Sequence, residues 1–506
     1  MTTLQGYLDP AAHADRIAIT SSTHSLAYRQ LDERSGRLAA FLRGHGLTER
    51  ANAGVVMRES PEYPVALLAI WKAGAAAAPV NPLARPRELE KVFSFVEARV
   101  VLCDAGQARE TLAKSSIDAA VIGIDDDGVR LGEQVIGWED LPSPISGAEV
   151  DGSSIAMLMH TSGTTSAPKT VMLSHENLVS NLRSIVSYLQ LDLDDRTLCV
   201  LPFHYVYGNS VLLTHLATGA RVFLGSAMSF PQRVVDEMER YAITGFSGVQ
   251  LTYHTLLNNT DWAQRRFETL RYLTQAGGPM PTSQVEFLLG LTRAPVSFFA
   301  MYGQTEASAR LTYLPPGKLH EKRGSVGIPV PGVELSIQDE QGTPLPAGTD
   351  GEVCARGPNI MQGYWKNESA TRHALRGGWL HTGDLGHLSA DGYLYLTSRT
   401  SDMIKTGGHR VSPYEIEEVI SEVAPHLIFA VVGLADDVLG QRISIVAEGE
   451  EDAAIKRQVM RYCKESLAPH KMPRAFIWIP KLPRTSGGKI RREALRKMET
   501  HNATGT

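Results

Sequence analysis

The sequence predicts a mixed α/β (α+β) fold, with a large N-terminal domain of α/β layers and a small α+β C-terminal domain. Three observations predict it. Short apolar runs alternate with helical patterns as far as about Gly324, turn-separated apolar runs follow, and a capped helix opens a mixed segment after Arg399. The length of 506 residues favours two to four domains, because domains of about 150 residues are usual.

The first part alternates segments typical of strands with segments typical of helices. Residues 156–160 form a short apolar run, and apolar side chains then recur at 178, 182, 185 and 189, which is helical spacing. The runs 221–224 and 234–241 repeat this order. Such alternation predicts helices layered on a sheet.

From about Gly324 the pattern changes to that of hairpins. Turn signals at 331–332, 339–342 and 391–392 separate short runs at 333–337, 352–355 and 393–396. Short runs bounded by Gly-, Pro- and Asp-containing turns predict antiparallel strands. We therefore expect a β-barrel-like subdomain at the end of the large domain.

A well-marked helix starts the C-terminal part. Ser412 supplies an N-cap, Pro413 occupies the first helical position, Glu415 the third, and apolar side chains follow at 416, 419 and 420. This combination is typical of a helix N-terminus. We place the boundary near residue 400, so that the domains comprise residues 1–400 and 401–506.

Composition excludes several classes of protein. The net charge of −5 disfavours a nucleic-acid or polybasic membrane-surface protein. The four cysteines are far apart, which argues against a disulfide framework or a structural zinc site. The longest apolar stretch, 65–80, contains Lys72 and Gly74 and is too short for a membrane span. No signal peptide is evident, and we expect a cytoplasmic protein.

The most distinctive segment is T-S-G-T-T-S-A-P-K over residues 161–169. Its hydroxyls and backbone amides can donate to phosphate oxygens, and Lys169 adds positive charge. It does not match the Walker A pattern. On composition alone, a Ser/Thr-rich surface turn is the alternative.

This segment resembles the T-S-G-T-T-G-x-P-K loop of the adenylate-forming (ANL) superfamily, which includes AMP-binding acyl-CoA synthetases. Ser166 and Thr170 stand where Gly is usual, which implies a stiffer loop with the same role. Further family motifs follow in the family's order up to Lys489, so the resemblance covers nearly the whole chain. It implies a small C-terminal domain that is mobile. The implied nucleotide-binding residues are Thr161, Ser162, Gly163, Thr164, Thr165, Lys169, Gly277, Gly278, Tyr302, Gly303, Gln304, Thr305, Asp384, Arg399 and Lys489.

The resemblance also implies individual roles. The glycine-rich segment 275–281 lies along adenine and the acyl pocket. In Y-G-Q-T-E, Tyr302 stacks on adenine, Thr305 contacts the α-phosphate and Glu306 helps to hold Mg²⁺. Asp384 of the T-G-D motif bonds the ribose hydroxyls. Carboxylate oxygen suits a hard cation that bridges phosphates.

The segment 398–410 resembles the hinge and the start of the mobile domain. Its acidic pivot position is occupied by Ser401, and only the following residue is acidic. A small polar residue can still absorb the backbone rotation of a hinge. The expected hinge residues are Ser401 and Asp402, and the expected thiol-cofactor side comprises Lys405, Gly407 and Gly408.

Near the C-terminus, residues 483–491 resemble the family segment P-K-T-x-S-G-K-I. Lys489 takes the position of the lysine that bridges the carboxylate and the α-phosphate, a task suited to a point cation on a glycine-flanked loop. The segment 471–497 contains nine Lys or Arg residues and one acidic residue, Glu493. This stretch is either a solvated helix face or a surface that faces anionic ligands.

The acid-binding region carries a second family signal. His204, in L-P-F-H-Y over residues 201–205, takes the position of a residue that gates the carboxylate pocket. No carboxylate occurs between 201 and 219, which disfavours an α-amino acid because its ammonium would lack a counter-charge. The side chains that line either the acyl pocket or the core are Tyr205, Tyr207, Val211, Val249 and Leu251.

The resemblance therefore implies an ATP-dependent carboxylic acid–CoA ligase that forms an acyl-adenylate and then a CoA thioester. Lys489, His204 and Thr305 are the expected catalytic residues, and ATP, Mg²⁺ and CoA the expected cofactors. A stand-alone ligase that loads carrier-protein phosphopantetheine is the alternative, with a free-standing acyl carrier protein as partner. A nucleotide-binding regulator without catalysis is the alternative from another class. Neither nucleic acid nor a membrane span is expected.

Overall fold

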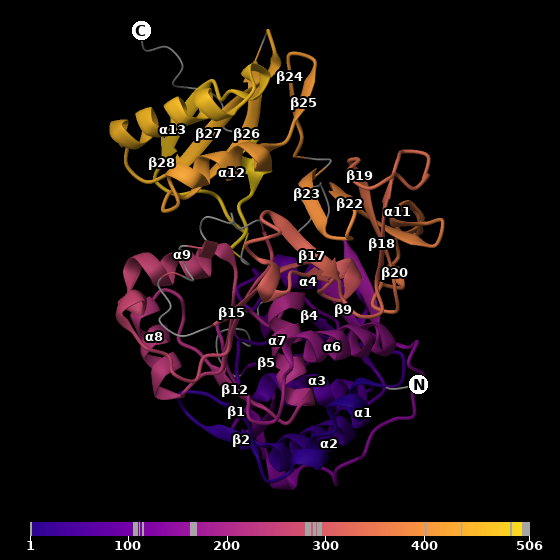
Figure 1. Cartoon of the computed structure of the whole chain (residues 1–506). Helices are drawn as coiled ribbons and strands as arrows, with labels where there is room; N and C mark the ends of the chain where they lie inside the picture. The colour runs from indigo at the N-terminus through magenta and orange to yellow at the C-terminus, as the bar shows by residue number, and fades with distance from the viewer. Residues whose placement is uncertain are drawn as a thin grey trace.

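The computed structural model describes residues 3–104, 110, 112–113, 116–161, 169–278, 285–286, 290, 296–399, 402–436, 438–485 and 488–497. Its strands form three sheets, and the residues after 402 lie at one end of the molecule (Figure 1). No helix in these ranges has the length and apolar character needed to cross a membrane.

The largest sheet has a parallel half in which neighbours in space are mostly neighbours in sequence. Pairs such as Thr197↔Gly245 and Gly245↔Tyr272 fix its register. Its strands include Tyr272–Gln275 and Ser297–Tyr302, which are largely buried and contain aromatic residues, as expected of parallel strands. They are β1 (Ile17–Thr20), β11 (Arg196–Cys199), β12 (Arg221–Leu224), β13 (Gly245–Gly248), β14 (Tyr272–Gln275) and β15 (Ser297–Tyr302), with β2 (Ser25–Ala27) antiparallel at the edge.

The hairpin-rich part continues this sheet through β15 and β16. All of its pairings are antiparallel, and the strand order is open, with β18 at one edge. The expected barrel-like subdomain is thus the antiparallel half of the largest sheet. Its strands are β16 (Thr312–Tyr313), β17 (Ser325–Pro329), β18 (Glu334–Gln338), β19 (Gly351–Arg356), β21 (Leu375–Arg376), β22 (Trp379–Leu388) and β23 (Leu394–Arg399).

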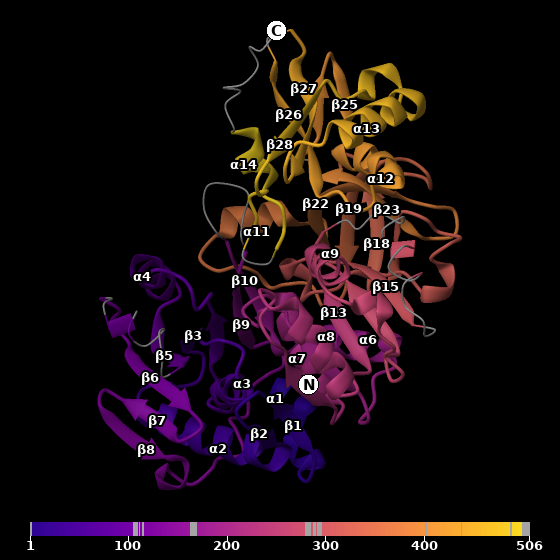
Figure 2. The ribbon, with the colours of Figure 1, turned by 90° about the vertical axis from the view of Figure 1, so that its left-hand side faces the viewer.

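The second sheet carries the predicted phosphate loop between two of its strands. Figure 2 shows one end of it, where β3, β5, β6, β7 and β8 lie side by side. Thr170 pairs with His160, so β9 and β10 form a hairpin around residues 161–169. The strands in spatial order are β20 (Gly363–Tyr364), β10 (Thr170–Ser174), β9 (Ile155–His160), β4 (Ala76–Pro79), β3 (Asn52–Val56), β5 (Ala98–Asp104), β6 (Ala120–Asp125), β7 (Gly128–Leu131) and β8 (Gln134–Gly137).

Helices pack on these sheets and bury their apolar side chains against them. Every residue of α3 (Glu62–Lys72) is buried, and Trp71 donates its indole N–H to the carbonyl of Ala156 in β9 at 2.9 Å. Ser174 caps α6 (His175–Leu189) by accepting from the amide of Asn177. The other long helices of this part are α2 (Tyr28–Gly44), α4 (Pro86–Phe95), α7 (Val206–Ala217), α8 (Pro231–Arg240) and α9 (Gln250–Asn259), with short α1 (Leu4–Leu8) and α11 (Glu368–Ala374).

The third sheet consists of strands that all begin after residue 402. Pairing along β26 and β27 extends from Phe429↔Ala447 to Asp436↔Gly440. Ser412 caps α12 (Pro413–Val423) as expected, accepting from the amide of Tyr414. The remaining elements are β24 (Ile404–Thr406), β25 (His409–Val411), β26 (Phe429–Asp436), β27 (Gly440–Glu448), β28 (Ala475–Ile479), α13 (Ala453–Ser466) and α14 (Arg492–Arg496).

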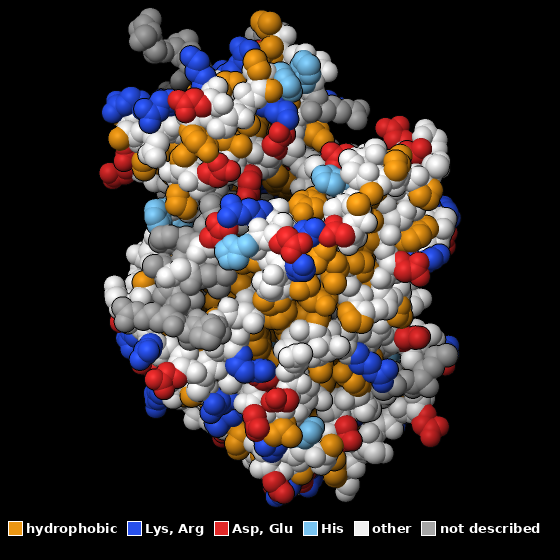
Figure 3. Space-filling view, in the orientation of Figure 1, with side chains coloured by type: hydrophobic (Ala, Val, Ile, Leu, Met, Phe, Trp, Pro, Cys, Tyr) orange, Lys and Arg blue, Asp and Glu red, His pale blue; other side chains and the backbone are white. Residues whose placement is uncertain are grey.

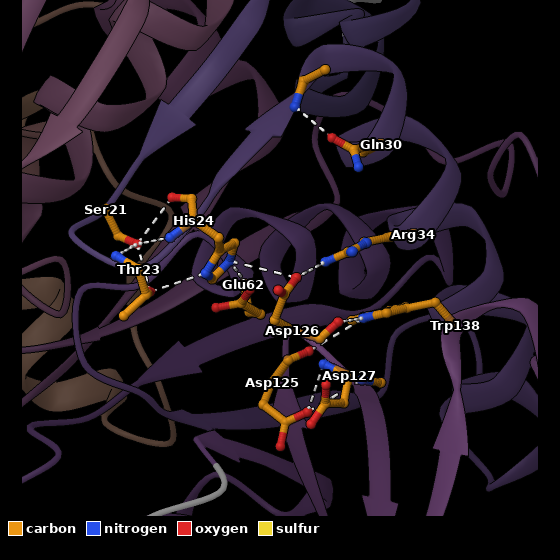
Figure 4. Close-up of polar contacts among 12 residues, drawn as sticks. Ser21, Thr23, His24, Gln30, Arg34, Glu62, Asp125, Asp126, Asp127 and Trp138 are labelled. Atoms are coloured by element: carbon orange, nitrogen blue, oxygen red, sulfur yellow. Dashed lines mark hydrogen bonds and ion pairs between the residues drawn. The ribbon is translucent and has the colours of Figure 1, made fainter.

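A polar network ties the β1–β2 hairpin to α3 and to the turn after β6 (Figure 4). His24 Nε2 lies 2.8 Å from Glu62 Oε1 and 3.8 Å from an oxygen of Asp126, which also accepts from Arg34 at 3.1 Å. The Glu62 side chain is only 5% exposed, so His24 provides its polar partner. Because Arg34 already places a cation on Asp126, this network joins N-terminal elements and does not present an open metal site.

Candidate active site

A cavity of about 600 Å³ separates the large part of the chain from the residues after 402. Residues of both parts line it, including Tyr302 and Asp384 from the largest sheet and Lys489 from the C-terminal part. On the face shown in Figure 3, hydrophobic side chains gather near the middle of the molecule, with charged side chains around them. The predicted site residues that line the cavity are Gly277, Gly278, Tyr302, Gly303, Asp384 and Lys489.

The chain turns back on itself directly after Tyr302. A Cβ on Gly303 would lie 2.0 Å from the carbonyl oxygen of Ala309, so only glycine permits this approach. Thr305 and Glu306 then form a short 3-10 turn, Thr305–Ala307. The fold-back holds the Y-G-Q-T-E segment at the carboxyl end of β15, where ligands of parallel sheets usually bind.

Tyr302 and Asp384 meet across the cavity wall. The Tyr302 hydroxyl donates to Asp384 Oδ2 at 2.6 Å, and both residues are buried. In the sheet, Asp384 pairs with Arg399 on the neighbouring strand. The side chain of Arg399 lies outside the described residues, but the register places the two predicted ribose contacts opposite each other.

Glu352, which the sequence analysis did not single out, clamps the turn that presents Asp384. Its Oε1 accepts from the amide of Gly383 at 3.2 Å, and its Oε2 lies 2.8 Å from Nδ1 of His381 and 2.9 Å from Nη2 of Arg376. Cys354 Sγ is 3.3 Å from the same His381 nitrogen. Burial and the Glu352 charge raise the pKa of the Cys354 thiol to about 12, so this cysteine is not a thiolate nucleophile.

The predicted phosphate loop is anchored at both ends. The amide of Thr161 donates to the carbonyl of Lys169 at 2.9 Å, which closes the base of the hairpin. Lys169 Nζ lies 4.8 Å from the centroid of the Tyr364 ring, and Tyr364 donates to Glu306 Oε1 at 2.8 Å. Burial and the Glu306 charge raise the pKa of Tyr364. The predicted residues Ser162, Gly163, Thr164 and Thr165 lie outside the described residues.

A strand separates this loop from the helix that follows it. The strand β10 directly follows the loop, and α6 begins only after this strand. The run Thr170–Ser174 pairs on both sides, with β9 and with β20. The strand ends at Ser174, the residue that caps α6, so no turn separates the strand from the helix.

Lys489 sits on a tight turn that packs against the large part. Gly488 donates its amide to Thr485 O at 2.9 Å, and the amide of Thr485 donates to Lys489 O at 2.8 Å. Gly488 has a φ of +79°, and a Cβ there would lie 3.3 Å from a methyl carbon of Val249. The backbone conformation and the close approach both favour glycine beside Lys489.

His204 lies just before α7 in an unusual state. Among the described residues neither ring nitrogen has a hydrogen-bond partner, although both atoms are buried. Burial lowers the pKa of His204 to about 4, so the ring is neutral near pH 7. Buried polar groups are normally paired, and these two nitrogens therefore mark a place where a ligand would supply the partners.

The predicted acyl-pocket candidates separate into two groups. Val249 and Leu251 line the cavity. Tyr207 and Val211 are absent from its lining. The Tyr207 hydroxyl lies 2.9 Å from Thr274 Oγ1, which fixes the ring at the ends of β13 and β14. Tyr205 packs on His204, with ring centroids 4.3 Å apart.

The predicted hinge and thiol-side residues that the structure describes make their contacts within the C-terminal part. Asp402 Oδ1 accepts from Arg496 at 2.8 Å, and Ser401 lies outside the described residues. Lys405 donates its amide to Gln441 Oε1 at 2.7 Å, and Gly407 and Gly408 form the β24–β25 turn with positive φ. None of these five predicted residues appears among the described residues that line the cavity.

Two family models match this chain. The model of AMP-binding enzymes matches residues 9–365, and the model of the AMP-binding enzyme C-terminal domain matches residues 415–489. Among curated proteins, a long-chain-fatty-acid–CoA ligase of Yersinia pestis is 30% identical, covering 97% of this chain and 93% of the relative. An oxalate–CoA ligase of Arabidopsis thaliana is 31% identical and covers 97% of each chain.

Solved structures agree with these relatives. An anthranilate CoA ligase in complex with anthranoyl-AMP superposes with a TM-score of 0.89 at 27% identity, covering 98% of this chain and 96% of the other. An o-succinylbenzoate coenzyme A synthetase from Bacillus subtilis, in complex with ATP and magnesium ion, gives a TM-score of 0.81 at 28% identity, covering 97% and 99%.

Proposed function

This chain belongs to the AMP-binding enzyme family. From that premise we propose which residue acts in which step of the reaction. It is an ATP-dependent acid–CoA ligase. The carboxylate attacks the α-phosphorus of ATP and releases pyrophosphate, and the thiol of CoA then displaces AMP from the acyl-adenylate. The observation that supports our assignment is the convergence of Tyr302, Asp384 and Lys489 on one cavity.

We propose that the nucleotide is held along the carboxyl ends of the central strands. Tyr302 stacks on adenine, and the buried carboxylate of Asp384, with Arg399 opposite, accepts from the ribose hydroxyls. Thr305 contacts the α-phosphate from the 3-10 turn. The loop 161–169 donates to the outer phosphates, and Lys169 at its end supplies charge.

Lys489 acts in the first half-reaction. As the acid attacks, negative charge accumulates between its carboxylate and the α-phosphate, and a cation fixed there lowers the barrier. No covalent enzyme intermediate is needed, so positioning and charge stabilisation account for catalysis. The turn that holds Lys489 against Val249 supports this role because it restrains the approach of the side chain.

The residues near Glu306 fit a magnesium ion. Tyr364 occupies Oε1 of this carboxylate, and within the described part of the chain no hydrogen bond involves Oε2. Carboxylate oxygen together with substrate phosphate is the usual ligand set of Mg²⁺. When bound, the ion neutralises charge on the phosphates, and Glu306 is the residue that holds it.

For the second half-reaction we propose that residues 401–506 rotate relative to residues 1–400. The pivot is Ser401–Asp402, which follows the last strand of the largest sheet. Rotation withdraws Lys489 and brings the β24–β25 turn with Lys405, Gly407 and Gly408 toward the cavity. Two positive-φ glycines leave room there for a thiol substrate.

His204 is the proposed gate of the acid pocket. Its neutral ring, with both nitrogens unpaired among the described residues, is available to a carboxylate or to the acyl-adenylate. The relatives named above act on acids as different as a long-chain fatty acid and oxalate. Family membership therefore does not define the acid.

A pyrophosphate-release screen tests the proposal. Fatty, aromatic and dicarboxylic acids are supplied with ATP and Mg²⁺, and thioester formation is then followed with CoA or with a holo-acyl carrier protein. We expect pyrophosphate release with a defined acid class and thioester formation on CoA. Absence of release across the screen would overturn the catalytic proposal.

The metal assignment has its own test. Glu306→Gln should raise the Mg²⁺ concentration that gives half-maximal pyrophosphate release, because it removes a negative ligand. Glu321→Gln is the matched control, since Glu321 is exposed and pairs with Lys318. Identical metal titrations for Glu306→Gln and the wild type would remove Glu306 from the metal site.

A further inference from the structure

Arg310 is a buried cation behind the wall of the cavity. It is 3% exposed, and its backbone is held by two asparagines. Asn181 Oδ1 accepts from its amide at 3.3 Å, while the side-chain amides of Asn181 and Asn359 donate to its carbonyl at 2.9 and 3.0 Å. Ser308 and Ala309 before it have positive φ values of 57° and 117°. This fold-back, which Gly303 permits, fixes where the arginine enters the interior.

No carboxylate neutralises this arginine among the described residues. Its Nε lies 3.3 Å from Met301 Sδ, its Nη1 lies 3.5 Å from the carbonyl of Ala309, and its Cζ lies 4.3 Å from the centroid of the Tyr207 ring. The neutral Tyr188 hydroxyl is a further hydrogen-bond partner. The segments before residue 400 that lie outside the described ranges contain no Asp or Glu.

These contacts do not use the guanidinium fully. It has five N–H donors, thioether sulfur is a weak acceptor, and an aromatic face offsets only part of the desolvation of a buried charge. A buried cation of this kind is retained at a cost unless a ligand supplies the missing anion.

The position of Arg310 indicates which part of a ligand reaches it. Met301, which it contacts, lines the cavity together with Gln275 and Lys489. Tyr207, on which it stacks, is three residues after His204, whose two nitrogens are unpaired in the described structure. An acid whose reacting carboxylate lies at Lys489 can meet Arg310 only with its other end, because Arg310 lies behind Met301.

We propose that Arg310 is a specificity-determining residue that binds a second anionic group of the acid, so that the substrate is a dicarboxylate. This inference rests on the proposed function of the cavity. The distal carboxylate takes the place of the Met301 sulfur at Nε and pairs with the guanidinium in two-point geometry. Met301 is unbranched and adaptable, which suits a side chain that yields to the ligand.

The test compares acids that differ only at the far end. Butanoate with succinate, hexanoate with adipate, and benzoate with terephthalate form three pairs. Pyrophosphate release gives kcat/KM for each acid, and calorimetry without ATP gives its binding. Arg310→Met is compared with the wild type, with Arg310→Lys and with the control Arg221→Met. Arg221 lies 4.5 Å from the Phe223 ring, has no carboxylate partner among described residues, and is absent from the cavity lining.

We expect the wild type to prefer the dicarboxylate in at least one pair by tenfold or more. Arg310→Met should remove that preference, with a loss of about 30-fold or more for the dicarboxylate and little change for its partner. Arg310→Lys should retain part of it, and Arg221→Met all of it. Arg310→Met should also melt no lower than the wild type without acid, because an uncompensated charge has been replaced by an apolar side chain of similar length.

Two results would overturn the proposal. One is a wild type that prefers the monocarboxylate in all three pairs. The other is an equal loss for both members of a pair in Arg310→Met, since Arg310 would then serve the reacting carboxylate or the fold. Absence of pyrophosphate release with every acid would instead count against the catalytic proposal. In that case a calorimetric preference for the dicarboxylate that Arg310→Met abolishes still upholds the inference, and no such preference overturns it.

Discussion

Replacing Lys489 with alanine should stop adenylation and spare thioester formation. Lys489 lines the cavity and ends a tight turn. Two backbone hydrogen bonds close this turn, from Thr485 N–H to Lys489 O at 2.8 Å and from Gly488 N–H to Thr485 O at 2.9 Å. The turn contacts the large part of the chain through Gly488 and Val249, so alanine leaves the backbone in place and removes only the charge. The proposed second half-reaction uses the β24–β25 turn instead, of which Lys405, Gly407 and Gly408 do not line the cavity.

The size of the effect follows from Coulomb's law. A unit charge about 4 Å from charge that develops in the transition state contributes roughly 4 kcal/mol at an effective dielectric constant of 20. This corresponds to about three powers of ten in rate. Loss of one oxyanion-stabilising donor in other enzymes costs about 10² to 10³ in kcat, which is the same range. We therefore expect the rate of pyrophosphate release to fall by about 10³.

The assay separates the two half-reactions. Pyrophosphate release from acid and ATP reports the first, and CoA thioester formation from supplied acyl-adenylate reports the second. The second should change by no more than a few-fold. Lys481→Ala is the control, because Lys481 is exposed, carries the same charge and does not line the cavity. An equal loss of both activities in Lys489→Ala would refute the assignment.

Three further predictions concern the fold around the site. Glu352→Gln should raise the KM for ATP about tenfold and weaken the preference for ATP over 2′-deoxy-ATP in pyrophosphate release, because the turn that presents Asp384 loses a charged hydrogen-bond acceptor. An unchanged nucleotide preference would argue for a purely structural role. Glu417→Gln should lower the free energy of unfolding of the C-terminal part by about 3 to 5 kcal/mol in urea titrations. Arg492 Nη2 donates to Glu417 Oε2 at 2.7 Å, and the substitution leaves the arginine buried without its charged partner. Substituting both residues with Met should recover much of the lost free energy of unfolding. Burial lowers the pKa of His175 to about 4, below its value near 6.5 in unfolded chains. As the pH falls from 6.5 to 4, the unfolded chain therefore binds a proton that the folded chain does not. The stability that this residue contributes above pH 6.5 is lost through that window. His175→Gln should flatten this part of the pH–stability profile measured by thermal unfolding, and a profile identical to that of the wild type would contradict the assignment.

Local patterns in the sequence predict many of the elements. The run 221–224 is β12, residues 156–160 fall in β9, the helical spacing from 178 to 189 is α6, and Ser412 caps α12. Each of these segments carries its own period or cap, so no distant contact is needed to identify it. The hairpin runs after Gly324 are likewise β18, β19 and β23.

The elements that the sequence does not reveal depend on partners far along the chain. β10 is defined by its pairing with β9 and with β20, about 190 residues later. β22 spans Trp379–Leu388 and contains the T-G-D motif, whose glycine and polar residues conceal a ten-residue strand. Strand pairing across such distances leaves no local period to detect.

Some residues of the candidate site can be predicted from the sequence, and others cannot. Tyr302, Asp384 and Lys489 are found from motifs, and they meet at one cavity. Glu352 and Arg310 are not found, because a glutamate in a hairpin strand and an arginine after a turn are ordinary in sequence. Only the structure shows that Glu352 accepts from the amide of Gly383. Likewise, only the structure shows that Arg310 is buried without a carboxylate partner among the described residues.

The pairing of β1 with β12 sets the order in which the chain can be assembled on the ribosome. Ile19 lies opposite Val222, so about 200 residues must be translated before the strand meets its neighbour. At 5 to 20 residues per second this takes roughly 10 to 40 s. Until then the β1–β2 hairpin has an open edge, and Tyr28, which donates to the carbonyl of Ala220 in the finished protein, lacks that acceptor. A nascent chain arrested before β12 therefore exposes an apolar hairpin edge to chaperones and to other chains.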